Sequence, residues 1–155
     1  MKHRGIATLA IAAIFAFLLL SQFDRQFFLL HIYESAIYVA LFFLLIYEGE
    51  EWAYVLGIAA PAAWLLLISV TNLSGVMRQA GLVLRFQRPD DSANLVGAMA
   101  MLISLLMLGT CLYRWKQQRW GFQHAWRTIA VVSGTVAVYY GVLVVWFTHL
   151  VRASR

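Results

Sequence analysis

One apolar stretch, residues 27–47, restricts the fold of this chain more than any other feature of its sequence. It reads FFLLHIYESAIYVALFFLLIY, and its 21 residues are enough for a helix to cross a bilayer. Glu34 in this stretch is the only carboxylate that lies well inside an apolar segment of the protein. An ionisable side chain at such a depth is costly in lipid, so Glu34 is expected to have a partner or a task.

Four other stretches have a similar length and character, and together they predict an all-α integral membrane protein, a bundle of five transmembrane helices in one domain. The predicted spans are residues 6–23, 27–47, 52–72, 94–113 and 128–150. The composition agrees, since 63% of the residues are hydrophobic and 12% are charged, against about 45–50% and about 25% in soluble domains. The first span has a basic flank and no small-residue cleavage site behind it, so it is expected to remain uncleaved and to act as the export signal.

The connection between the third and fourth spans, residues 73–93, is the longest and the least apolar. We expect it to hold a short interfacial helix, followed by a turn in which Asp91 or Ser92 caps the fourth span. The predicted apolar face of this short helix comprises Val76, Met77, Ala80, Val83 and Leu84, with Arg78, Gln79 and Arg85 off that face.

Three small residues, Ser133, Ala137 and Gly141, follow one another at intervals of four in the fifth span. In lipid, a stripe of this kind lets two helix backbones approach closely. The stripe therefore predicts close helix packing for the fifth span. We favour packing inside the bundle, and the alternative is a seam between two copies of the chain.

An odd number of spans places the two termini on opposite sides of the membrane, with six Lys or Arg residues on each side. The count alone does not decide the orientation. The basic flank of the first span and the basic loop 114–127 favour a cytoplasmic N-terminus and an external C-terminus, in what we take to be a bacterial inner membrane. In and beside that loop, contacts with the membrane interface or with anionic lipid are expected from Arg114, Lys116, Arg119, Arg127, Trp115, Trp120 and Trp126.

The candidate polar site is a stripe on the second span formed by His31, Glu34 and Tyr38, which are three and four positions apart. At about 1.5 Å per residue, Glu34 lies roughly 10 Å and His31 roughly 6 Å below the outer end of that span. Glu34 is expected to be either protonated, or charged and paired with His31 or an arginine. The topology also places His149, near the end of the fifth span, on the same side as His31.

Three interpretations of this stripe are open. The first is a buried polar contact that fixes the helix register, and the second is a proton or cation relay through Glu34 and His31. The third is a haem b held by His31 and His149. No other cofactor and no metal is predicted, because the sequence lacks metal-ligand spacings, nucleophile elbows and phosphate-binding loops. Its single cysteine, Cys111, cannot form a redox pair within the chain.

The function favoured by these features is that of an accessory or structural subunit of a larger membrane complex rather than an enzyme. The alternatives are a proton-coupled or redox-linked membrane component centred on Glu34 and His31, and a small membrane enzyme acting on lipid-phase substrates. The expected partners are the bilayer and other membrane subunits or a second copy of the chain. Nucleic acid is not expected, despite the net charge of +5, because the basic residues lie between apolar runs.

The length, the five predicted spans and the six tryptophans are loosely similar to the translocator-protein family. This similarity is one of composition. The chain lacks the proline-rich early helices of that family, because its only prolines are Pro61 and Pro89. No function is therefore carried across.

Overall fold

The computed structural model describes residues 4–47, 50–117 and 122–153, and every regular element in these ranges is a helix. The elements in order are α1 (Arg4–Phe23), the 3₁₀ turn η1 (Arg25–Phe27), α2 (Phe28–Tyr47), α3 (Glu50–Thr71), α4 (Leu73–Leu84), α5 (Ser92–Gln117) and α6 (Phe122–Ala153). Within the described ranges, five helices, all except α4, are long and apolar enough to cross a membrane. The predicted number of long apolar helices is confirmed.

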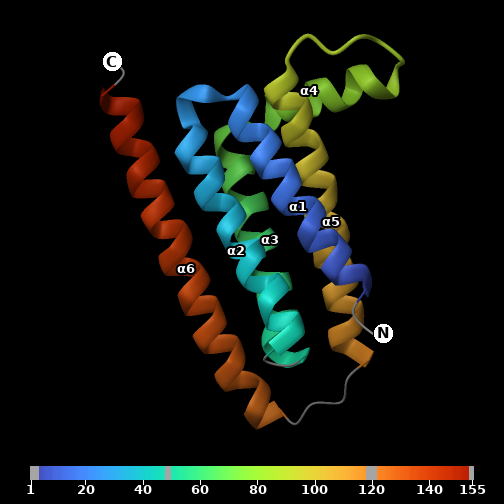
Figure 1. Ribbon diagram of the computed structural model, residues 1–155, viewed down its shortest axis with the longest axis vertical. Coiled ribbons are helices and arrows are strands. Elements are labelled where there is room, and N and C mark those ends of the chain that lie inside the picture. Colours follow the sequence, from blue (N-terminus) through green and yellow to red (C-terminus); the bar gives the residue numbers. More distant parts are fainter. Residues whose placement is uncertain (1–3, 48–49, 118–121, 154–155) are drawn as a thin grey trace.

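The five long helices run up and down the bundle, whereas α4 lies across one end of it (Figure 1). We call this end the α4 end; it also holds η1 and the last turns of α6 (Figure 1). α1 begins at the opposite end, so the first and last helical residues lie at opposite ends of the bundle (Figure 1). This arrangement is the one expected for an odd number of crossings.

Aromatic packing joins the first three helices at the centre of the bundle. Phe17 of α1 is fully buried. Its ring stacks on Tyr38 of α2 at a centroid distance of 5.4 Å and meets the indole of Trp64 of α3 edge-on at 5.2 Å. Aromatic rings favour both of these geometries. The contact brings the polar stripe of α2 against the middle of α3.

α6 packs mainly on α3 and touches α2 much less. A reciprocal pair of tyrosines makes the link to α2: the rings of Tyr33 and Tyr139 stack with their centroids 4.2 Å apart. The Tyr33 hydroxyl donates to the Tyr139 carbonyl at 3.3 Å, and the Tyr139 hydroxyl donates to the Tyr33 carbonyl. This pairing helps to set the rotation of α6 about its own axis.

With α6 in that rotation, its stripe of Ser133, Ala137 and Gly141 faces outward and is exposed. A Cβ added to Gly141 would meet nothing within 4 Å. The prediction that the stripe packs inside the bundle is therefore wrong, because larger side chains take the inward positions. The inward residues are Val132, Val136, Tyr140 and Leu143. Packing between copies of the chain, or against another subunit, stays a prediction.

α4 forms as predicted, but its buried face is different from the predicted one. Val76 and Gln79 are its buried residues, at 1% and 2% exposure, while Met77 and Leu84 are exposed. Gln79 faces inward because its amide binds the turn before α5: it donates to the carboxylate of Asp90, and its oxygen accepts the Asp90 backbone N–H at 3.3 Å.

The turn between α4 and α5 is held by charged and polar contacts. Asp90 receives the hydrogen bond from Gln79 and lies 2.5 Å from a guanidinium nitrogen of Arg78. The hydrogen bond first, and the Arg78 charge after it, lower the pKa of Asp90. The carboxylate of Asp91 accepts the backbone N–H of Asn94 at 3.1 Å. Asp91 is thus the cap of α5, one of the two predicted candidates.

The basic and aromatic residues predicted for the membrane interface gather at the end opposite α4, where α5 ends and α6 begins (Figure 1). Trp126 is 63% exposed, and Lys116 and Arg127 are exposed as well. Arg114 and Trp115 are half-buried. Arg119 and Trp120 lie outside the described residues. Contact of this group with lipid stays a prediction.

Candidate functional site

The two polar residues singled out on α2 are in direct contact. His31 Nδ1 lies 2.8 Å from Glu34 Oε2, one helical turn further along. Both side chains are buried, since His31 is 9% and Glu34 is 4% exposed. The spacing of three residues places them on one face of α2, and the packing of α2 against α1 and α3 turns that face inward.

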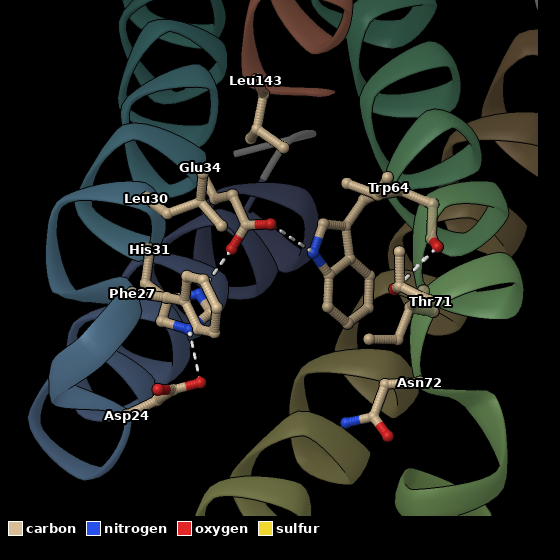
Figure 2. Close-up of a pocket in the computed structure, with 11 residues that line it drawn as sticks. Asp24, Phe27, Leu30, His31, Glu34, Trp64, Thr71, Asn72 and Leu143 are labelled. Atoms are coloured by element: carbon tan, nitrogen blue, oxygen red, sulfur yellow. Dashed lines mark hydrogen bonds and ion pairs between the residues drawn. The ribbon is translucent and has the colours of Figure 1, made fainter. Parts of the chain in front are cut away.

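Two further partners complete this group, and neither was expected from the sequence. The indole N–H of Trp64 donates to Glu34 Oε1 at 3.2 Å, and Asp24 Oδ2 lies 3.6 Å from His31 Nε2. Figure 2 shows His31 between the two carboxylates, with Trp64 reaching Glu34 from α3. Of the two partners considered for Glu34, His31 is in contact with it, and the other donor is an indole N–H and not an arginine.

The sequence offers a weak signal for Asp24 and none for Trp64. Asp24 lies between α1 and η1, seven positions before His31, a separation that corresponds to about two turns of a continuous helix. Trp64 is separated from Glu34 by 30 positions, and only the packing of α3 on α2 unites them. Within the described residues, Asp24 makes no side-chain capping bond to η1, which leaves its carboxylate turned toward His31.

A cavity of about 280 Å³ adjoins the group. Its polar lining consists of Asp24, His31, Glu34, Trp64, Thr71 and Asn72, and its apolar lining of Phe27, Leu30, Leu67, Ile68 and Leu143. A smaller cavity of about 80 Å³ shares Asp24, His31 and Glu34 and extends toward α4 and α5. The cavity lies at the α4 end, where the side chain of Asp24 is 32% exposed.

The chemistry of the group depends on the two imidazole nitrogens. When Glu34 is ionised, His31 Nδ1 carries the hydrogen that is shared with it, because a carboxylate only accepts. His31 Nε2 points toward Asp24 and, among the described residues, has no hydrogen-bond partner. An imidazole can take a proton on one nitrogen and release one from the other. The arrangement can therefore transfer a proton between a half-exposed and a buried carboxylate.

The other predicted site residues lie outside the cavity. Tyr38 is fully buried one turn below Glu34, and its hydroxyl has no hydrogen-bond partner within the described ranges. His149 is exposed and does not line the cavity, to which α6 contributes Leu143. The structure thus brings His31 to Glu34 and leaves His149 outside. The residues that it describes also contain no group of three or more His, Cys, Asp or Glu arranged for a metal ion.

The fold and the site together define a class: a bundle of five helices of membrane-spanning length with a buried carboxylate, histidine and indole group that opens at one end. Comparison of the chain with protein families, with curated proteins and with solved structures yields no match.

Proposed function

We propose that this protein is a proton-coupled membrane component in which Glu34 takes up and releases a proton inside the bundle. The observation that carries the proposal is the position of Glu34: it is 4% exposed, and both of its oxygens have donors, His31 and Trp64. A carboxylate is costly at this depth, and protonation removes that charge.

The proton path runs from Asp24 through His31 to Glu34. The carboxylate of Asp24, whose side chain is 32% exposed, takes a proton from the aqueous side and passes it to His31 Nε2, 3.6 Å away, through one bridging water or after the two groups close to hydrogen-bond distance. His31 then releases its other proton, from Nδ1, to Glu34 over 2.8 Å. After this transfer the imidazole of His31 is neutral, with its hydrogen on Nε2. When Glu34 releases its proton, the same two steps run in reverse. In the predicted orientation, this path opens on the external side of the inner membrane.

Infrared difference spectroscopy tests this proposal. With the protein in lipid nanodiscs, the pH is lowered from about 8 to about 4, into the range in which carboxylates take up protons. The protonated-carboxyl band that appears is expected to lose the contribution of Glu34 in Glu34→Gln and to keep it in Glu51→Gln, a matched change at the other end of the bundle. In His31→Ala, hydrogen-to-deuterium exchange of this band should become slower. A spectrum that is the same in Glu34→Gln and in the native chain would refute the proposal.

A second candidate function, that of a subunit in a larger membrane assembly, is favoured by the outward stripe of α6. Ser133, Ala137 and Gly141 are exposed on a helix of membrane-spanning length. Small residues on such a face allow another helix to approach closely. The two functions are compatible, because the stripe and the proton site use different faces.

Gly141→Leu is expected to dissociate this assembly without unfolding the chain, because Gly141 is exposed and a Cβ added there meets nothing within 4 Å. Gly109→Leu is the matched control, since Gly109 of α5 is equally open but lies outside the stripe. Native mass spectrometry and thermal unfolding in mild detergent measure assembly and stability. If Gly141→Leu leaves the mass of the native complex unchanged, the stripe is not an interface.

A further inference from the structure

The cavity beside Glu34 has the walls of a small-molecule site. Its volume of about 280 Å³ is close to the lower end of known ligand cavities, about 300–1,000 Å³. Phe27 and Trp64 supply aromatic surfaces, and Leu30 and Leu143 are among the aliphatic side chains of the lining (Figure 2). The Thr71 hydroxyl donates to the Leu67 carbonyl at 2.9 Å, and the Asn72 amide donates to Asn94 at 2.5 Å. The carboxylates of Asp24 and Glu34 are therefore the main polar groups that remain to recognise a ligand.

The charge of this lining favours a cation. Asp24 and Glu34 are acidic, and among the described residues that line the two cavities there is no Lys or Arg. When Asp24 and Glu34 are ionised and His31 is protonated, these three side chains together carry a net charge of −1. Trp64 donates a hydrogen bond to Glu34 but brings no charge. A negative charge in a largely apolar cavity is costly until a positive charge compensates it.

His31 supplies a second, independent observation. The residue is 9% exposed, it lines both cavities, and its Nε2 has no hydrogen-bond partner within the described ranges. When His31 is neutral and donates from Nδ1 to Glu34, Nε2 presents a lone pair toward the Asp24 carboxylate 3.6 Å away. Two acceptors that face each other attract a positive charge between or beside them.

We infer that this cavity binds a small amphiphilic organic cation, an ammonium with an apolar body, in exchange for the proton held by Asp24, His31 and Glu34. The inference rests on the proposed function and names the class of ligand. The ammonium lies against the carboxylates and the face of Trp64, which attracts cations. The apolar body lies among the aliphatic side chains toward Leu143.

The exchange balances in charge. One monovalent cation enters as one proton leaves Glu34 through His31 and Asp24, so the total charge of the occupied cavity does not change. The other titratable groups that act on Glu34 are Tyr38 on α2 and Tyr139 and Tyr140 on α6. Phenols are neutral near pH 7. From α3 and α5 the two cavities receive only uncharged side chains among the described residues.

Equilibrium dialysis of phenyltrimethylammonium against the full-length protein in zwitterionic nanodiscs tests this site, because the charge of this probe does not vary with pH. We expect saturable binding that weakens by about tenfold for each pH unit once protons compete. The uncharged probe of the same shape, tert-butylbenzene, should not compete. Glu34→Gln should weaken binding by about thirtyfold or more, while Glu51→Gln should bind like the native chain.

Three outcomes would overturn the inference: equal competition by tert-butylbenzene, unchanged binding in Glu34→Gln, or binding of one strength at every pH. The first and third are measured on the native chain and do not depend on the folding of a variant. The infrared titration of Glu34 is a separate measurement without the probe. A titrating Glu34 with no cation binding would refute this inference alone, and a Glu34 that does not titrate would refute the proposed function.

Discussion

Trp64→Ala lowers the free energy of unfolding of the bundle by about 3–5 kcal/mol, the range for removal of a buried aromatic side chain. Trp64 is 2% exposed, packs edge-on against Phe17 at 5.2 Å and donates to Glu34. The change therefore leaves a void between α1 and α3 and removes one partner of a buried carboxylate. Reversible unfolding in mixed detergent micelles measures the loss.

The matched control is Trp52→Ala on the same helix, because Trp52 is 39% exposed. It should cost much less, and an equal cost for both variants would show that burial at Trp64 is not the cause. Trp64→Phe separates packing from hydrogen bonding. It keeps an aromatic ring but leaves Glu34 Oε1 without its donor, at a cost of about 1–3 kcal/mol. In a Glu34→Leu background, the cost of Trp64→Phe should shrink, because no carboxylate remains to be satisfied.

Gly57→Ala is expected to destabilise the contact between α3 and α5 by about 1–3 kcal/mol, the usual cost of overpacking. A Cβ at Gly57 would lie 2.6 Å from Cys111 Sγ and 3.7 Å from a methyl carbon of Leu41. Cys111 is fully buried, so its sulfur has little room to move. Thermal unfolding of the purified protein in detergent measures the change.

Two companion variants test the cause of this effect. Gly109→Ala makes the same substitution on α5, where the added Cβ meets nothing within 4 Å, so it should be neutral or stabilising. Cys111→Ala removes the sulfur and should restore stability in the double variant with Gly57→Ala, because the next atom, the Cβ of residue 111, is 3.6 Å away. Additive losses in the double variant would contradict a steric cause.

Half of the candidate site could be predicted from the sequence. His31 and Glu34 are three positions apart on one apolar helix, and helical geometry alone makes them neighbours. The Asp91 cap of α5 was among the predicted candidates for the same reason, because caps are local. Asp24 and Trp64 were missed. Their contacts depend on how the chain turns into α2 and on how α3 packs against α2.

Which side of a helix is turned toward the bundle was not predicted correctly for α4 and α6. The sequence placed Ser133, Ala137 and Gly141 on one stripe of α6, yet this stripe faces outward, because Tyr139 pairs with Tyr33 and larger residues fill the inward positions. Similarly, Gln79 of α4 faces inward because Asp90 satisfies its amide. Lipid tails are as apolar as the side chains inside a helix bundle. Hydropathy therefore does not distinguish a helix face turned to lipid from one turned to protein.

The sequence by itself determined the number of long apolar helices, their order and the position of one acid among them, because these depend on chain length, hydropathy and local helical spacing. The tertiary structure alone decided that the acid is held by an indole from α3, that a second carboxylate faces the histidine, and that a cavity adjoins all of them. The physical reason is that such contacts join residues far apart in the chain, and they are set by the rotation and packing of whole helices.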